Sequence, residues 1–207
     1  MNAAVSLDGF VAGDDDVPGP IFDWYGNGPV AVHLGDEERV FHVSPQTAQV
    51  LEGVRESTAA GIIGRRLFDL VDGWGGRPPA GEHVFVVTHR PADDWAWKDT
   101  APFTFVGSVE EAVERARAFA GDRDVSITAG DVGGQALRLG LVDRVVMHLA
   151  PAVLGSGRPF FGAGSLTEAI ELEDPQVVQG DRVTHLVFDV RRDRPANPRT
   201  GPGYAED

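Results

Sequence analysis

Three apolar runs of this 207-residue chain each end in residues suited to binding phosphate groups. Gly64-Arg65 follows the first run, Thr88 and Arg90 follow the second, and residues 129–132 follow the third. Arginine offers a planar, permanently charged fork to phosphate oxygens, and a glycine-rich turn before a helix presents backbone N–H groups to a pyrophosphate. In an open α/β sheet, ligands bind beyond the carboxyl ends of the strands. The three strand ends together indicate a dinucleotide site, and the two arginines favour NADP over NAD.

Each of these strand ends also has an ordinary structural interpretation. Arg65 can be a surface residue in the first turn of a helix, where a positive charge is mildly unfavourable. Thr88 and Arg90 can belong to a plain loop. The third turn, Ala129-Gly130-Asp131-Val132, matches neither GxGxxG nor a P-loop, and Asp131 can simply be the N-cap of the following helix. The dinucleotide hypothesis therefore depends on the three strand ends occurring together.

Acidic residues near the N-terminus and the histidines carry weaker signals. Asp8 precedes Gly9 in a standard turn pair, so a structural role is as open as a catalytic role in proton transfer. Asp14-Asp15-Asp16 lacks the spacing of an EF-hand, and a solvated acidic loop is favoured over a calcium site. The six histidines show no HExxH or comparable spacing, so we expect no metal site.

The composition excludes several classes of protein. The formal net charge of −14 disfavours nucleic acids and anionic membrane surfaces as partners, because binding to either needs a basic face. The chain contains no cysteine, which excludes disulfides, thiolate metal sites and cysteine nucleophiles. It has neither an apolar run of about 20 residues nor the order of a signal peptide, so we expect a cytoplasmic protein. Because the strand before Ser6 is short, we expect the natural chain to begin upstream of Met1.

The negative charge is distributed unevenly. Residues 1–60 hold 2 basic and 10 acidic side chains, and residues 91–207 hold 12 basic and 19 acidic side chains. Residues 64–90 hold 4 basic and 3 acidic side chains, so they are the one segment of the three that is not acidic. This segment contains both arginine-bearing strand ends. Because an acidic protein repels a dinucleotide at long range, binding must depend on these local arginines.

Hydrophobic periodicity predicts the elements that position these residues. Continuous apolar runs indicate buried strands, whereas Ser44-Pro45 and the capping pair of Ser108 with Glu111 indicate helix N-termini. We expect strands at residues 2–6, 59–63, 84–88, 103–106, 125–128 and 144–150, helices that begin after residues 44, 64 and 108, and a further helix that follows a glycine-rich turn and ends near residue 139. Residues 12–44 show little periodicity, and we expect them to form a long irregular excursion.

The C-terminal part of the chain alternates like a half-buried sheet. Ile170 and Leu172 between acids, followed by alternating apolar residues over 184–190, predict an antiparallel hairpin with its turn near Gly180-Asp181. Apolar strands separated by helices indicate a mostly parallel sheet that is covered on both faces. The predicted class is therefore α/β with a mixed sheet in a single domain over residues 1–190, followed by a flexible tail at residues 191–207.

Five motifs follow one another along residues 3–190. They are Ser6-Leu7-Asp8-Gly9-Phe10-Val11-Ala12, Gly64-Arg65-Arg66-Leu67-Phe68-Asp69, Thr88-His89-Arg90-Pro91, Ala129-Gly130-Asp131 with Gly140-Leu141-Val142-Asp143, and residues 151–157 with Phe160-Phe161. In this order they resemble the motifs of the dihydrofolate-reductase-like family that includes the C-terminal reductase domain of the bifunctional riboflavin enzyme RibD. The resemblance implies the three-layer dihydrofolate-reductase fold, NADPH as hydride donor, a small-molecule substrate and a homodimer.

The resemblance also implies roles for individual residues. Around the cofactor, Arg65 would meet the adenosine 2′-phosphate beside Gly64, with Thr88 and Arg90 nearby. Leu67 stands where related enzymes have a threonine on the pyrophosphate, so that hydrogen bond would be lost. The remaining assignments are the pyrophosphate turn, formed by Ala129, Gly130, Asp131 and Val132, the nicotinamide and substrate side, formed by Val5, Asp8 and Phe10, and the opposite wall of the pocket, formed by Leu154, Gly155 and Arg158.

Two departures from the family pattern bear on the substrate. Dihydrofolate reductases carry an acid near the start of the helix before the Gly-Arg motif, whereas residues 45–48 here contain no carboxylate, which disfavours folate. The family's Gly-Gly pair reads Ala129-Gly130. The leading hypothesis is an NADPH-dependent reductase of the RibD type that acts on a ribosylamino-pyrimidine in riboflavin biosynthesis. The alternatives are a reductase of a folate, a pterin or another carbonyl compound, and a non-catalytic dimeric nucleotide-binding protein.

Overall fold

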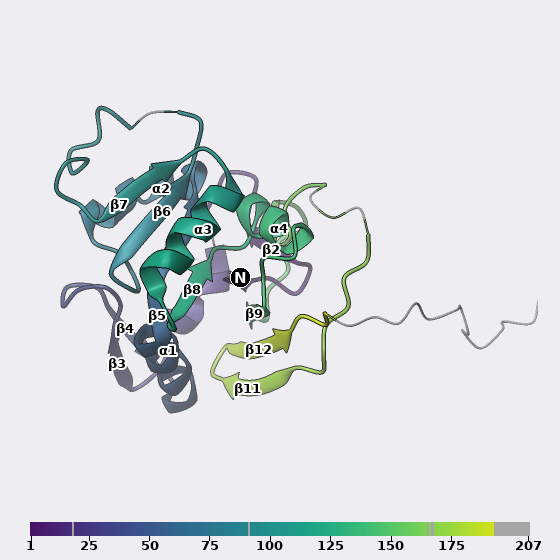
Figure 1. Ribbon diagram of the computed structural model, residues 1–207. Helices are drawn as coiled ribbons and strands as arrows, with labels where there is room; N and C mark the ends of the chain where they lie inside the picture. Colours follow the sequence, from purple (N-terminus) through teal and green to yellow (C-terminus); the bar gives the residue numbers. More distant parts are fainter. Residues whose placement is uncertain (18, 91, 165, 167, 193–207) are drawn as a thin grey trace, which may run out of the picture.

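The computed structural model describes residues 1–17, 19–90, 92–164, 166 and 168–192, and its centre is a sheet made of two four-stranded parts (Figure 1). The first part has the order β7-β6-β5-β8 and the second the order β1-β9-β12-β11. A parallel bridge between Asn2 and Thr128 joins them, and the Ala129 amide donates to the Asn2 carbonyl at 3.0 Å. The bounds of these strands are β1 Asn2–Val5, β5 Thr58–Gly64, β6 His83–Val87, β7 Phe103–Val106, β8 Asp124–Ile127, β9 Arg144–Leu149, β11 Gln176–Gly180 and β12 Val183–Asp189.

Strand directions confirm the predicted mixed sheet. β7, β6, β5 and β8 pair in parallel, and so do β1 and β9. β12 runs antiparallel to both β9 and β11. The sheet is thus mostly parallel with an antiparallel hairpin at its C-terminal edge, as the sequence predicts.

Helices cover both faces of the sheet. Neighbouring residues of a strand point to opposite faces, so the core clusters to which they belong show which helices lie on each face. Helices α3 (Val109–Ala120) and α4 (Asp131–Arg138) pack with Ile62 and Val5 in one core cluster. The adjacent strand residues Ile63 and Ala4 belong to other clusters. Those clusters contain α1 (Pro45–Ser57), α2 (Arg65–Leu70) and the 3-10 segment η1 (Gly19–Tyr25). The three-layer, single-domain architecture is confirmed.

The helix N-termini follow the predicted capping chemistry. The Ser44 hydroxyl accepts from the Thr47 amide at 3.3 Å, and the Ser108 hydroxyl accepts from the Glu111 amide at 3.1 Å. At α4, Gly130 holds the N-cap position with φ +93°, so the alternative that Asp131 is the N-cap is wrong. A left-handed φ at this position suits glycine, which has no Cβ to clash.

Two predicted segments differ from the structure. Residues 12–44 are not irregular throughout, because they contain η1 and an antiparallel hairpin of β3 (Val30–His33) and β4 (Val40–Val43). These four-residue strands have little buried surface, so their alternation is too short to recognise. The first strand of the C-terminal hairpin is β11, and Leu172 makes only an isolated bridge to Val190. The edge position of β11 leaves Val177 59% exposed and hides its pattern.

The remaining elements lie close to the strand ends. β2 (Phe10–Ala12) pairs with the short strand β10 (Arg158–Pro159), and η2 (Asp72–Gly76) follows α2. Arg191, at the start of the predicted tail, forms ion pairs with Glu171 and Glu173, whereas residues 193–207 lie outside the described residues. Within the described part of the chain, no helix is both long and apolar enough to cross a membrane.

Candidate active site

The carboxyl ends of β5, β6 and β8 lie at one edge of the sheet because these strands are adjacent and parallel. Gly64, Thr88 and the turn after β8 therefore come together, as the sequence predicts. A Cβ on Gly64 would lie 3.1 Å from the Val132 side chain. Helix α2 begins directly after β5, and α4 begins after the short turn that follows β8. The structure brings the three predicted phosphate-binding turns side by side.

Arg65 and Arg90 meet on either side of one carboxylate. Arg65 donates from Nε to Asp69 Oδ1 at 2.7 Å and from Nη1 to the Arg90 carbonyl at 2.9 Å. Arg90 reaches the other oxygen of Asp69 at 3.3 Å, and its amide donates to the Thr88 hydroxyl at 3.0 Å. Two guanidinium groups therefore share one carboxylate at this point of the sheet. The first and second strand ends thus meet in one cluster of two arginines and one shared carboxylate.

The start of α4 offers backbone donors next to this cluster. The first intrahelical bond is donated by Gly134 to the Gly130 carbonyl at 2.8 Å, so the amides of Asp131, Val132 and Gly133 precede the helical ladder. A Cβ on Gly130 would meet nothing within 4 Å, which leaves open space in front of the turn. The Asp131 carboxylate is turned aside and accepts from the Ala163 amide at 3.1 Å. An arginine cluster beside an open helix N-terminus fits the phosphates of a dinucleotide.

Asp8 serves as a hydrogen-bond acceptor at the end of β1. Its Oδ1 accepts from the Ser6 hydroxyl at 2.6 Å and from the Leu154 amide at 3.1 Å, and its Oδ2 accepts from the Gly155 amide at 2.7 Å. The Ser6 hydroxyl, followed by the two amides, holds the pKa of Asp8 below its usual value. Asp8 is therefore ionised at neutral pH and anchors the loop at 154–155 against the first motif.

The other predicted site residues differ in how deeply they are buried. Phe10 is half-buried in β2 and donates its amide to the Ser6 hydroxyl at 3.0 Å. Val5 is fully buried in the core at the end of β1, so its side chain is not exposed to solvent. Leu67 packs against the apolar cluster under α2, in agreement with the absence of a polar contact there, and Ala129 packs against the core beneath the third turn.

Asp16 links two arginines that lie far apart in the sequence. Its carboxylate accepts from Arg66 through Nε at 2.8 Å and through Nη2, and from Arg158 Nε at 3.2 Å. Sequence reasoning placed Arg158 at the pocket but missed Arg66 and Asp16. The repeated arginine of Gly64-Arg65-Arg66 was the available signal for one, whereas nothing local distinguishes Asp16 from its acidic neighbours.

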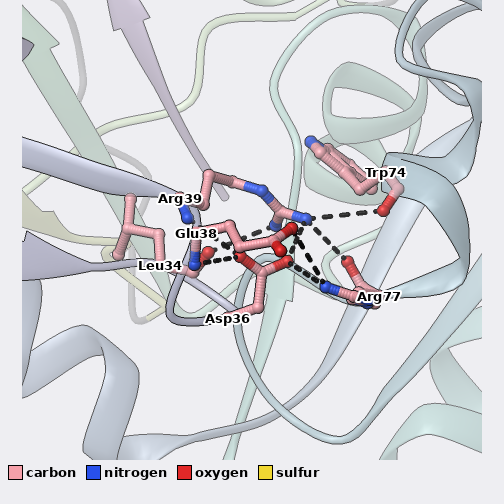
Figure 2. Close-up of polar contacts among 6 residues, drawn as sticks. All are labelled: Leu34, Asp36, Glu38, Arg39, Trp74 and Arg77. Carbon is pink, nitrogen blue, oxygen red and sulfur yellow. Dashed lines mark hydrogen bonds and ion pairs between the residues drawn. The ribbon is translucent and has the colours of Figure 1, made fainter.

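Two surface cavities lie beside α2 and η2. One of about 240 Å³ is lined by Arg65, Phe68, Trp95 and four aspartates, which are Asp69, Asp72, Asp93 and Asp94. The other, of about 410 Å³, lies between the β3–β4 turn and η2 and is lined in part by Trp74 and Trp97. Figure 2 shows the polar contacts beside Trp74. There Arg39 donates to the carbonyls of Leu34, Trp74 and Arg77 at 3.2–3.5 Å and to Asp36 at 3.1 Å. This arginine fastens the hairpin to η2 and lies away from the strand ends.

A buried histidine pair lies on the opposite half of the sheet. The Nδ1 atoms of His148 and His185 are 2.8 Å apart, and His185 Nε2 lies 3.0 Å from the Thr47 hydroxyl. Burial, followed by the neighbouring His185, lowers the pKa of His148 to about 3, and burial lowers that of His185 to about 4. The pair is neutral and joins β9 and β12 to α1. The described residues contain no group of three or more His, Cys, Asp or Glu that could hold a metal ion.

Comparisons with known proteins identify the family and agree with the fold. The family model described as the RibD C-terminal domain matches residues 1–186. A search of curated proteins finds no match. Among solved structures, a protein assigned to riboflavin biosynthesis in Shewanella sp. PV-4 is 20% identical with a TM-score of 0.61, over 92% of this chain and 97% of that chain.

Two further structures have the same fold. A pyrimidine reductase-like protein from Corynebacterium diphtheriae is 17% identical with a TM-score of 0.56, over 93% of this chain and 91% of that chain. A Thermotoga maritima deaminase and 5-amino-6-(5-phosphoribosylamino)uracil reductase is 12% identical with a TM-score of 0.56. This chain covers 55% of that longer protein, and 92% of this chain is matched.

Proposed function

Because the chain belongs to the RibD C-terminal domain family, we propose that it is a reductase that uses NADPH and acts on a pyrimidine ribosylamine-like substrate. The observation that carries the cofactor half of this proposal is the cluster of Arg65 and Arg90 beside the open N-terminus of α4. The substrate half rests on the family and on the names of its structural relatives, such as 5-amino-6-(5-phosphoribosylamino)uracil reductase.

Different residues at the strand ends would bind different groups of the cofactor. Arg65 and Arg90 would hold the adenosine 2′-phosphate, since a guanidinium fork matches phosphate oxygens. The backbone amides of Asp131 and Val132, together with the open side of Gly130, would hold the pyrophosphate. When bound, the nicotinamide supplies a hydride to an electrophilic carbon of the substrate. The task of the protein is to hold the two reacting groups in a productive orientation.

Asp8 is a positioning residue in this proposal. Its ionised carboxylate is occupied by three donors, so it has no proton to give at neutral pH. By fastening Leu154 and Gly155, it fixes one wall of the substrate pocket next to Phe10. The proton that balances hydride transfer then comes from water. Placing Arg158 near this wall gives the pocket a cation for an anionic substrate.

The proposal extends to the assembly and the compartment. The resemblance implies a homodimer, and the outer edge of β11, with Val177 largely exposed, is available for pairing with a second copy. A cytoplasmic location fits a small-molecule biosynthetic enzyme without cysteines. Light scattering after gel filtration tests the dimer, and a monomer at micromolar concentration would contradict it.

Rapid mixing of the protein with NADPH and 5-amino-6-(5-phosphoribosylamino)uracil tests the proposed reaction directly. We expect the absorbance of the reduced nicotinamide to decay with substrate, and not with dihydrofolate. Arg65→Gln should lower the rate at limiting NADPH, whereas Arg77→Gln, which removes an exposed arginine elsewhere, should not. Absence of turnover with both NADPH and NADH would contradict the reductase proposal, and tight NADPH binding without turnover would favour the non-catalytic alternative.

A further inference from the structure

The contact between Asp16, Arg66 and Arg158, here called the Asp16 bridge, joins three segments at the mouth of the site. Arg66 lies in the first turn of α2, Arg158 lies in β10, and Asp16 lies in the turn after β2. Asp16 accepts from Arg66 through Nε and Nη2 and from Arg158 through Nε. Two convergent guanidinium groups around one anion form the arrangement that proteins use for phosphates and carboxylates.

The bridge is held by side chains that a ligand can reach. The Arg66 and Arg158 side chains are 57% and 47% exposed, whereas the Asp16 side chain between them is 14% exposed. The turn itself is short, since the Gly13 amide donates to the Val17 carbonyl at 3.1 Å. One further side-chain contact fastens it, from the Ser156 hydroxyl to Asp14 at 2.5 Å. An anion that replaces Asp16 would therefore release the turn without disturbing the sheet.

Its place in the fold puts the bridge next to the proposed substrate and cofactor. Arg66 follows Gly64-Arg65 in the chain, and a Cβ on Gly64 would lie 3.1 Å from Val132 of the third turn. Arg158 belongs to the segment in which Phe160 accepts from the Gly130 amide at 2.7 Å and donates to the Gly9 carbonyl at 2.9 Å. Arg66 therefore follows the first strand end in the chain, and Arg158 belongs to the segment that contacts the third turn, and both side chains converge on Asp16.

We propose that Arg66 and Arg158 form a subsite for a phosphate monoester group of the substrate, and that Asp16 occupies this subsite until the substrate arrives. The inference rests on the proposed function for the identity of the ligand. The phosphates of the cofactor have their own partners in Arg65, Arg90 and the start of α4. Asp16 is a stand-in anion of lower charge than a phosphate dianion, so the substrate phosphate competes for the same donors and frees the turn at residues 13–17.

Phosphate binding by calorimetry at fixed ionic strength tests the subsite without cofactor or turnover. Asp16→Asn keeps a residue that tolerates the φ of +63° and removes the competing charge. We expect this variant to bind inorganic phosphate and ribose 5-phosphate on the order of fivefold more tightly than the parent, because the free subsite is then the dominant state. Adding Arg158→Gln to Asp16→Asn should abolish the gain.

A matched control removes the same charge elsewhere. Asp23 pairs at 3.9 Å with Arg182 in the β11–β12 turn, so Asp23→Asn should leave phosphate affinity unchanged. An equal gain in Asp23→Asn, no gain in Asp16→Asn, or a gain that survives Arg158→Gln would overturn the subsite. A gain for NADP⁺ in place of ribose 5-phosphate would overturn the assignment to the substrate. If Asp16→Asn binds phosphate more tightly but the protein does not oxidise NADPH, the reductase proposal is refuted and the subsite remains supported. If the protein oxidises NADPH with the substrate but Asp16→Asn does not bind phosphate more tightly, the subsite is refuted and the reductase proposal remains supported.

Discussion

Two arginine clusters of this molecule differ in what accepts their hydrogen bonds. Arg39, in Figure 2, donates to three backbone carbonyls and one carboxylate, and its side chain is 22% exposed. Arg66 and Arg158 share the side chain of Asp16 and are about half exposed. A backbone carbonyl cannot leave without local unfolding, but a side-chain carboxylate can rotate away and be replaced by another anion. The comparison separates arginines that hold the fold from arginines that are available to a ligand.

The buried histidine pair, like Arg39, holds the fold together, and its titration should give the largest change in the free energy of unfolding. Because burial depresses the folded-state pKa values of His148 and His185, their contribution to stability is complete above the unfolded value of about 6.5 and is lost as the pH falls toward 4. At about 1.4 kcal/mol per pKa unit, the free energy of unfolding should fall by roughly 3–6 kcal/mol between pH 7 and pH 4. Urea unfolding at several pH values measures this.

The histidine assignment has its own control. His148→Leu should reduce the fall in the free energy of unfolding between pH 6.5 and 5 by about half, because His185 keeps its lowered pKa, and His89→Gln, at an exposed histidine, is the matched control. Carboxylates with lowered pKa values, such as Asp8 and Glu173, titrate below this window. A parent protein whose free energy of unfolding is constant from pH 7 to pH 5 would show that the pair does not contribute.

Arg39→Ala tests the fold-holding arginine itself. It leaves the carbonyls of Leu34, Trp74 and Arg77 without this donor, so we expect a loss of about 2 kcal/mol in the free energy of unfolding. The affinity for NADPH should stay within about twofold, because the cluster lies away from the strand ends. Arg77→Ala removes an exposed side chain at 3.6 Å from Asp36 and should cost under about 0.5 kcal/mol. Equal costs for the two variants would break the comparison.

The expected loss in stability for Asp8→Asn lies between those for Arg39→Ala and Asp16→Asn. Asp8 accepts from backbone amides, as a residue that holds the fold does, but it lies at an exposed position. The amide group cannot accept from both Leu154 and Gly155 as well as Ser6, so we expect a loss of about 1 kcal/mol in stability. The KM for the substrate should rise more than kcat falls if, as proposed, Asp8 positions the loop and water supplies the proton. Steady-state kinetics across pH 6–9 checks this, with Glu37→Gln as a charge control. A kcat that collapses while KM stays constant would instead make Asp8 the proton donor.

Asp16→Asn should give the smallest change in stability. Exposed ion pairs contribute about 0–1 kcal/mol, and the arginines regain hydration when the carboxylate is removed. We expect a change in the free energy of unfolding below about 0.5 kcal/mol, measured beside Arg39→Ala in the same denaturant series. A loss as large as that of Arg39→Ala would place the Asp16 bridge among the contacts that hold the fold.

The sequence predicts most of the sheet and the three strand ends because these depend on local patterns. Apolar runs such as residues 59–63 and capping residues such as Ser108 determine strands and helix starts over a few positions. The contacts that complete the site are not local. Asp8 meets Gly155 across 147 positions, and Asp16 meets Arg158 across 142. These pairs are created by the packing of β2 on β10, which no single segment specifies.

The most direct test of the central claim is the affinity of the protein for NADPH compared with NADH, measured by fluorescence titration. We predict that the parent binds NADPH about tenfold or more tightly than NADH, because Arg65 and Arg90 would contact the additional phosphate. We also predict that Arg65→Gln removes this preference and that Arg77→Gln retains it. Equal affinities in the parent, or a preference that survives Arg65→Gln, would contradict the assignment of these strand ends to the cofactor.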